Sequence, residues 1–232
     1  MRLGTLVLGR HPVLVGVLTE FHNKRVLSNA LRSGIDAVEL RIDHCNKPDT
    51  ALQAGIIGTI RARALPIIAT VRSIREGGKY PITDKKRVEL FRTLIPLTDA
   101  VDIELSSKEI LKDVVKAAKR SRKRVIISHH NFQSTPPKIR LERIIDQGRS
   151  EGGDIIKIAA MVKDDRDLRR LARVTLEHKN LVTIAMGSRG IASRIFFPLL
   201  GSLLTYAPIG EATAPGQLPI KVTREELNRY YL

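Results

Sequence analysis

A lysine stands in the middle of an apolar segment whose residues are typical of a buried β-strand. Lys157 lies within Asp154–Met161, and every other residue after Asp154 in that segment is apolar. Burial disfavours the charged ammonium and favours the neutral amine, which is a nucleophile that forms a Schiff base with a ketone or aldehyde. The alternative is an edge-strand lysine whose stem covers apolar surface while its head reaches water.

Neighbouring strand-like segments also carry charged residues, and these fall on one face of each segment. Residues two apart on a strand share a face, and in Ala37–Asp43 the charged residues alternate with Val38, Leu40 and Ile42. The polar alternates on five consecutive segments are Glu39, Arg41, Arg72, Asp102, Glu104, His130 and Lys157. A structural ion pair explains any one of them, but together they indicate an active site, because buried charges require partners or a function.

The residue types suggest roles within such a site. His130 is the natural proton shuttle near neutral pH, whereas His129 alternates outward and is predicted to pack or hydrogen bond beneath a helix. Arg41, Arg72 and Arg194 are predicted to bind an anionic substrate, and the arginines would also disfavour the ammonium of Lys157. No zinc-ligand spacing or P-loop is present, so neither a metal nor a cofactor is expected.

The elements that would position these residues alternate along the chain. Strands are predicted at Val13–Thr19, Ala37–Asp43, Pro66–Ser73, Ala100–Leu105, Arg124–Phe132, Asp154–Val162, Leu181–Gly187 and Leu203–Ile209. Helices are predicted near 22–33, 49–63, 83–97, 107–120, 137–150, 164–178 and 188–199, with a last one beginning near Thr223. This alternation predicts an α/β fold, a closed (β/α)₈ TIM barrel in which the polar faces converge inside and the apolar faces meet the helices.

Two further features refine this architecture. Residues Leu3–Leu8 and the turn at Gly9–Pro12 predict an N-terminal β-hairpin that closes the bottom of the barrel. The segment 212–217 follows the last strand and is placed to close over the site, although an ordinary surface connection has the same composition. An open doubly wound sheet is the alternative fold, but the G-x-G-x-x-G turn after the first strand is missing.

Composition limits the other possibilities. The chain has 232 residues, and we expect one catalytic domain over 1–232. A single cysteine excludes an internal disulfide and favours the cytoplasm, and no apolar run is long enough to span a membrane. The net charge of +16 is compatible with nucleic-acid binding, but the basic runs lack interleaved aromatic residues, so no nucleic-acid partner is expected.

Seven motifs resemble those of the type I 3-dehydroquinate dehydratases of the shikimate pathway, across nearly the whole chain. They are Glu39–Arg41, Thr70–Arg72, Glu76–Gly78, Asp102–Glu104, Ser128–Phe132, Lys157–Ala159 and Ala214–Gln217. Each motif is weak alone, but their order and their placement on the strands are specific. The resemblance implies a hydro-lyase that converts 3-dehydroquinate to 3-dehydroshikimate and water, the third step of aromatic amino acid and chorismate biosynthesis.

The resemblance also implies residue roles. Lys157 would form the Schiff base, His130 would act as general acid and base, and Glu76 would orient His130. The substrate would be held by Glu39, Arg41, Arg72, Arg194, Thr213 and Gln217. Members of the family are commonly dimers, so the resemblance implies a homodimer.

Two positions depart from the family pattern. Asn131 follows the catalytic histidine where many members carry aspartate, and Thr213 replaces a common serine. Neither change removes a catalytic group, so activity is expected. The competing hypotheses are a class I aldolase, which also uses a strand lysine but does not explain the other motifs, and a basic binding module without catalysis.

Overall fold

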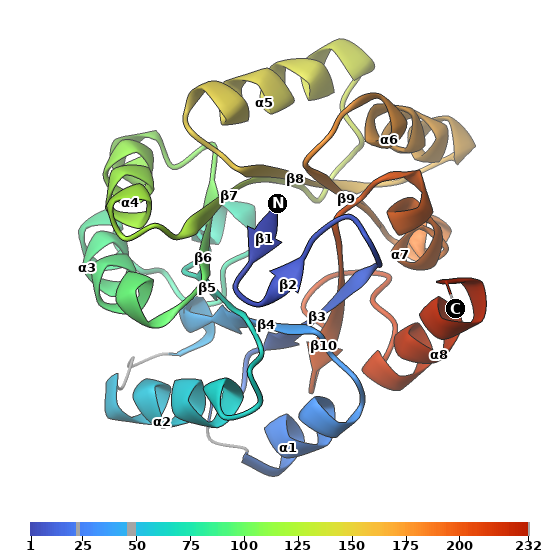
Figure 1. Cartoon of the computed structure of the whole chain (residues 1–232). Coiled ribbons are helices and arrows are strands. Elements are labelled where there is room, and N and C mark those ends of the chain that lie inside the picture. The colour runs from blue at the N-terminus through green and yellow to red at the C-terminus, as the bar shows by residue number, and fades with distance from the viewer. Residues whose placement is uncertain (22–23, 46–49, 232) are drawn as a thin grey trace.

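The computed structural model describes residues 1–21, 24–45 and 50–231, in which parallel strands alternate with helices that surround them (Figure 1). The barrel strands are β3 (Val13–Leu18), β4 (Ala37–Arg41), β5 (Ile67–Thr70), β6 (Ala100–Glu104), β7 (Arg124–Asn131), β8 (Ile155–Met161), β9 (Leu181–Met186) and β10 (Leu204–Ile209). The helices are α1 (Lys24–Arg32), α2 (Thr50–Arg61), α3 (Asp84–Leu94), α4 (Lys108–Arg120), α5 (Lys138–Ser150), α6 (Asp165–Glu177), α7 (Ser193–Phe196) and α8 (Ile220–Tyr231).

The eight parallel strands form one nearly closed barrel. Hydrogen-bonded neighbours run in the order β10-β3-β4-β5-β6-β7-β8-β9. The seam between the two ends of this order is bridged at the start of β9, where Leu181 pairs with Ser202 and accepts the main-chain N–H of Leu203 at 2.9 Å. The predicted (β/α)₈ barrel is confirmed, and the open doubly wound sheet is excluded.

Two apolar layers hold the barrel together. The outward alternates, such as Val38, Leu40 and Ile158, belong to a large cluster shared with the helices. The inward alternates near the strand starts, such as Ala100 and Ile155, form a separate smaller cluster inside the barrel. This inner cluster also extends to Val17, Ile184 and Met186 near the carboxyl ends of β3 and β9, where these apolar side chains share the barrel interior with the charged alternates.

A short hairpin crosses the amino-terminal end of the barrel, as Figure 1 shows. Its strands are β1 (Arg2–Leu3) and β2 (Leu6–Val7), and Leu3 is fully buried in the inner apolar cluster. The hairpin is confirmed, but the predicted turn is wrong. The chain reverses at Gly4, whose φ of 53° is favourable for glycine, whereas Gly9–Pro12 connects the hairpin to β3.

Several predicted element bounds also differ from the structure. The predicted helix over 188–199 is broken into the 3₁₀ turns Ser188–Gly190 and Phe197–Leu200 on either side of α7, and Pro198 lacks the N–H needed to continue an α-helix. Helix α8 begins at Ile220 rather than near Thr223. The predicted helix starts at residues 22 and 49 lie outside the described residues. No helix in the described part of the chain is long and apolar enough to cross a membrane.

Strands β4 and β5 end earlier than predicted, and this affects the site. β4 ends at Arg41 and is followed by a 3₁₀ turn over Ile42–His44, while β5 ends at Thr70. Asp43 and Arg72 therefore lie on the connections just beyond the strands rather than within them. Both side chains are nonetheless buried, and Arg72 lines the cavity described below.

Candidate active site

A cavity opens inside the barrel toward the carboxyl ends of the strands. All nine residues predicted for catalysis or substrate binding line it: Glu39, Arg41, Arg72, Glu76, His130, Lys157, Arg194, Thr213 and Gln217. They come from strands β4, β7 and β8 and from the connections that follow β5, β9 and β10. The fold therefore brings together residues that are up to 178 positions apart, from Glu39 to Gln217.

Lys157 extends from β8 into this cavity, with its side chain only 5% exposed. Its Nζ lies 2.9 Å from Asp102 Oδ2 and 3.5 Å from Glu39 Oε1. The same Nζ lies 4.1 Å above the centre of the Tyr206 ring, a cation–π contact. The charged groups in contact with Lys157 are thus two carboxylates, whereas the sequence predicted that neighbouring arginines would act on its charge.

Arg72 lies in the wall of the cavity, where it forms ion pairs with Asp102 and with Glu104. Its Nη1 donates to Glu104 Oε1 at 2.9 Å and to Ser128 Oγ at 2.7 Å, and its Nη2 donates to Asp102 Oδ1 at 2.9 Å. Burial opposes its charge, yet Asp102 and Glu104 raise the pKa of Arg72 above its ordinary value. Burial likewise opposes ionisation of Asp102, but Arg72 and Lys157 lower the pKa of that carboxyl. Asp102 therefore carries a negative charge shared by two cations.

His130 is held by Glu76, which lies on the 3₁₀ turn Ile74–Glu76 after β5. Glu76 Oε2 accepts the main-chain N–H of His130 at 2.8 Å and lies 3.0 Å from its Nδ1, while Ser106 donates to Glu76 Oε1. Because Oε2 faces Nδ1 as an acceptor, the proton of the neutral ring lies on Nδ1 and Nε2 keeps a lone pair. Burial, with Arg72 nearby, lowers the pKa of His130 to about 3. The imidazole is therefore neutral at physiological pH and can act as a base.

Asp43 is a site residue that the sequence reasoning did not single out. It is fully buried and accepts Arg41 Nε and Nη2 at 2.9 and 2.8 Å. It also accepts the main-chain N–H groups of Arg72 at 3.1 Å and Lys79 at 3.2 Å. Burial opposes its charge, but the hydrogen bonds from Arg41 lower its pKa. Its place on the same strand face as Glu39 and Arg41 was the signal that could have identified it.

Arg194, on α7, is a buried cation of a different kind. Its side chain is 3% exposed, its Nη2 donates to Pro215 O at 3.3 Å, and its Nε is buried without a hydrogen-bond partner in the described residues. No carboxylate of the described chain forms an ion pair with it, and burial lowers its pKa to about 10. A buried guanidinium with an unused donor, facing a cavity, is suited to bind an anion.

The connection after β10 folds over the cavity beside Arg194. Gln217 Oε1 accepts the main-chain N–H groups of Thr213 at 2.7 Å and Ala214 at 3.2 Å, and the Thr213 hydroxyl at 3.3 Å. At Gly216, where φ is 78°, an added Cβ would lie 2.6 Å from Gly187 O, so only glycine fits. The amide oxygen of Gln217 is used within the loop, which leaves its NH₂ group to face a ligand.

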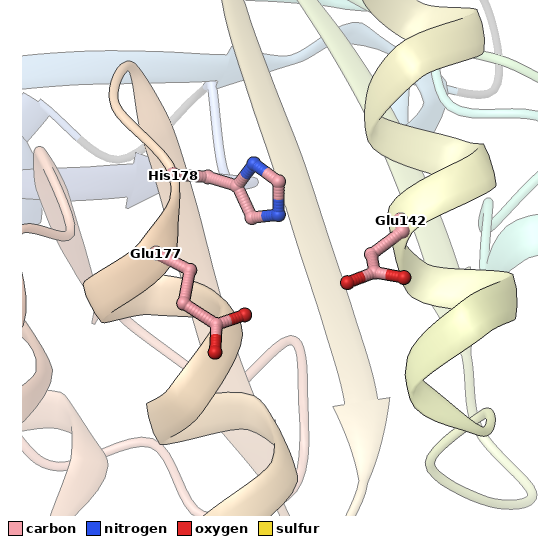
Figure 2. A group of neighbouring side chains, drawn as sticks. All are labelled: Glu142, Glu177 and His178. Carbon is pink, nitrogen blue, oxygen red and sulfur yellow. The ribbon is translucent and has the colours of Figure 1, made fainter.

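Two other groups of titratable side chains lie away from this cavity: His129, and a cluster on the outer helices. His129 faces outward as predicted, but its buried Nε2 has no hydrogen-bond partner in the described chain, and burial lowers its pKa. Glu142, Glu177 and His178 approach each other between α5 and the end of α6, as Figure 2 shows. Lys138 Nζ lies 2.6 Å from Glu177 and 3.5 Å from Glu142, so these carboxylates already have a cation.

Known proteins with the same sequence pattern and fold are dehydroquinases. The sequence model of the family described as type I 3-dehydroquinase matches residues 13–231. A 3-dehydroquinate dehydratase from Methanococcoides burtonii is 38% identical over 223 residues, covering 95% of this chain and 95% of that protein. The crystal structure of 3-dehydroquinate dehydratase from Geobacillus kaustophilus superposes with a TM-score of 0.89 and 29% identity, covering 100% of this chain and 97% of that one.

A further solved structure is similar to this chain and includes a ligand. It is the type I 3-dehydroquinate dehydratase from Clostridium difficile with covalent modified comenic acid. It has a TM-score of 0.87 and 26% identity, and the match covers 98% of this chain and 96% of that one.

Proposed function

The chain belongs to the type I 3-dehydroquinase family, and on that premise we propose that it dehydrates 3-dehydroquinate through a Schiff base on Lys157. One observation carries the mechanism: a buried lysine and a neutral histidine face one cavity from adjacent strands. In the register of β7 and β8, Ser128 pairs with Lys157 and His130 pairs with Ala159. His130 therefore lies one inward position beyond Lys157, within reach of atoms bonded to its amine.

Substrate binding is assigned by charge. The carboxylate of 3-dehydroquinate is bound by Arg194, because this buried guanidinium has an unused donor and no anionic partner in the described chain. The amide of Gln217 and the hydroxyl of Thr213 contact the same end of the ring. Glu39, Arg41 and Arg72 line the opposite, hydroxyl-bearing side.

Imine formation uses the carboxylates around Lys157. The neutral amine attacks the C3 carbonyl carbon, and one proton moves from the attacking nitrogen to the oxygen to give a carbinolamine. A second proton, taken up from solvent, lets the carbinolamine lose water and leaves a protonated imine. The imine nitrogen keeps the position of the ammonium, whose Nζ lies 2.9 Å from Asp102 Oδ2. Asp102 therefore stabilises the positive charge before and after the bond forms, and the protonated imine acts as the electron sink.

Elimination uses the free lone pair of His130. Nε2 removes the proton at C2, and the C–H electron pair forms the C2–C3 double bond of an enamine. The electrons then return to expel the C1 hydroxyl, which leaves as water after taking a proton from the imidazolium. Glu76, at 3.0 Å from Nδ1, orients the ring and stabilises its transient positive charge. Hydrolysis of the imine releases 3-dehydroshikimate and regenerates Lys157.

The direct test is chemical trapping of the imine. Incubation with 3-dehydroquinate and borohydride is expected to reduce the imine to a stable secondary amine on Lys157. Mass spectrometry of the peptides would show the added mass of the bound ring compound, less one water and plus the two hydrogens of the reduction. An absorbance assay is expected to detect the conjugated enone product. An adduct that forms only with a sugar phosphate would instead favour a class I aldolase, and submicromolar, salt-dependent nucleic-acid binding without turnover would favour a binding module.

We also propose that residues 1–232 act as one catalytic domain and that the enzyme works as a homodimer in the cytoplasm. The single eight-stranded sheet supports the first point, the family resemblance supports the second, and the single cysteine supports the third. Sedimentation equilibrium would measure the mass of the assembly. A monomer at assay concentration, with full activity, would contradict the dimer.

A further inference from the structure

One of the largest fully buried side chains in the described structure is charged and lies outside the cavity. Arg87, in the first turn of α3, is 1% exposed. We propose that Arg87 is a positioning residue that sets the charge state and location of Lys157 through Glu104, Arg72 and Asp102. This inference rests on the proposed imine chemistry, because it concerns how readily Lys157 becomes a nucleophile.

Arg87 is satisfied by groups from three different segments. Its Nε donates to Val71 O at 2.9 Å, and its Nη1 donates to Asp84 Oδ1 and Ser107 Oγ, both at 2.9 Å. Its Nη2 donates to Glu104 Oε2 at 2.5 Å. Every nitrogen of the guanidinium is bonded, so the side chain is fixed between the helix layer and the end of β6.

Glu104 divides its two oxygens between two arginines. Its Oε2 accepts Arg87 and the Ser107 hydroxyl, the latter at 2.7 Å. Its Oε1 accepts Arg72 Nη1 and the main-chain N–H of Ser73, both at 2.9 Å. Because Arg87 occupies Oε2, Glu104 offers Arg72 a single oxygen. Arg72 therefore keeps its other nitrogen, Nη2, on Asp102 Oδ1 at 2.9 Å.

The remaining oxygen of that aspartate, Asp102 Oδ2, is the one that binds Lys157, at 2.9 Å. The result is a buried row of alternating charges from α3 to the reacting amine. Its members, in order, are Arg87, Glu104, Arg72, Asp102 and Lys157. Such a row has few degrees of freedom, because each carboxylate contacts a cation on both sides.

Removal of the Arg87 charge changes both the potential and the geometry at Lys157. Glu104 keeps its negative charge with one cation fewer, and Arg72 is drawn toward the freed oxygen and away from Asp102. Both effects leave Lys157 facing more negative charge, which favours the ammonium over the nucleophilic amine. Other charged or titratable groups also bear on the row. Asp84 lies beside Arg87, Asp43 and Glu76 act on Arg72, and Glu39, His130 and Tyr206 lie beside Lys157 or Asp102.

The test compares the pH dependence of kcat/KM in variants that change one charge at a time. The quantity compared is the acid-side midpoint, which is the pH at which kcat/KM has fallen to half of its plateau value on the acid side. Arg87→Met is expected to move the acid-side midpoint to higher pH by about one unit, because the lost charge acts on Lys157 through buried groups that solvent screens little. Glu104→Gln is expected to move the midpoint to lower pH. The double variant, Arg87→Met with Glu104→Gln, is expected to return the midpoint toward the wild-type value. Arg87→Lys keeps the charge and is expected to retain most of the wild-type profile.

Arg92→Met is the matched control, because Arg92 lies on the same helix and is exposed to solvent. The fraction of protein trapped by borohydride at fixed pH, measured beside each profile, reports on the amine itself. The inference is overturned if Arg87→Met shifts the midpoint no more than Arg92→Met, or if Arg87→Met and Glu104→Gln shift it in the same direction.

A variant that does not fold, or a wild-type protein that lacks the proposed activity, can be distinguished from a failure of this inference. If Arg87→Met does not fold, the comparison between Glu104→Gln and the double variant decides, since the double variant is expected to have the higher midpoint. Equal midpoints in those two variants would contradict the inference. Wild-type protein without turnover or imine trapping would instead refute the proposed function, whereas active wild-type protein with unshifted variants would refute only the role of Arg87.

Discussion

Lys157 and Arg72 share one carboxylate: Asp102 accepts Arg72 Nη2 on Oδ1 and Lys157 Nζ on Oδ2, each at 2.9 Å. The shared carboxylate fixes the amine relative to the wall of the barrel. In the proposed mechanism it also provides a counter-charge for the protonated imine, which has the same charge as the ammonium it replaces. The same partner would then serve both the resting enzyme and the proposed covalent intermediate.

Lys157→Ala is expected to abolish imine trapping and to lower kcat by at least about 10⁴-fold, because the nucleophile is removed. The change also leaves Asp102 and Glu39 without their shared cation. Lys163→Ala is a suitable control, since Lys163 is exposed just beyond β8. The absorbance assay measures both, and substantial turnover by folded Lys157→Ala protein would contradict the mechanism.

Asp102→Asn tests the shared carboxylate. We expect a loss of about 3 kcal/mol in the free energy of unfolding, since the change leaves two buried cations with one negative partner fewer. We also expect kcat to fall by about 10²-fold as the protonated imine loses its counter-charge. Urea unfolding and steady-state kinetics measure the two effects. Glu39→Gln, which alters the longer 3.5 Å contact, is expected to be milder in both.

Glu76→Gln is expected to lower kcat by about 10- to 100-fold, as removal of a group that orients a functional histidine commonly does. The glutamine can still contact His130 but cannot stabilise the imidazolium with a full charge. Ser106→Ala is the matched control, because it removes a donor to Glu76 while leaving its contact with Nδ1. An unchanged kcat in Glu76→Gln would show that the imidazolium is stabilised by other groups.

His130 is expected to make the protein sensitive to acid. Its pKa is about 3 in the folded state against an ordinary value of 6.5, so the unfolded chain binds the proton more readily. Its contribution to stability is therefore present above pH 6.5 and is lost as the pH falls toward 3, at about 1.4 kcal/mol per unit. Urea unfolding between these limits is expected to show a shallower pH dependence for His130→Gln than for wild type. Equal slopes would contradict this assignment.

Arg194→Met is expected to lose activity while gaining stability. Burial of its charge without an anionic partner in the described residues lowers its pKa to about 10, and this burial is unfavourable in the free enzyme. Replacement with methionine is expected to raise the free energy of unfolding by about 1 kcal/mol or more and to raise KM by about 100-fold. Arg189→Met, at an exposed arginine nearby, is the control. A stability loss in Arg194→Met would argue against an unpaired charge.

Much of the barrel and of the cavity lining could be predicted, because the alternation of side chains along each strand leaves few ways to bury its apolar residues against the helices. Charged residues at every second position cannot face an apolar helix layer, so Glu39, His130 and Lys157 had to point inward. Local signals were weaker at turns and helix ends. The hairpin turn lies at Gly4 rather than at Gly9–Pro12, since both segments contain glycine and only strand pairing distinguishes them.

For the cavity residues that lie on strands, the sequence alone determined that their side chains face inward, because that follows from a period of two along each strand. These residues are Glu39, Arg41, His130 and Lys157. Only the tertiary structure decided which charge meets which. The early ends of β4 and β5 place Asp43 on Arg41, and the adjacency of the strands places Asp102 between Arg72 and Lys157. The two Asp102 pairings depend on distances between segments remote in the chain, and no local pattern contains them. The Asp43–Arg41 pairing is local, but it depends on where β4 ends.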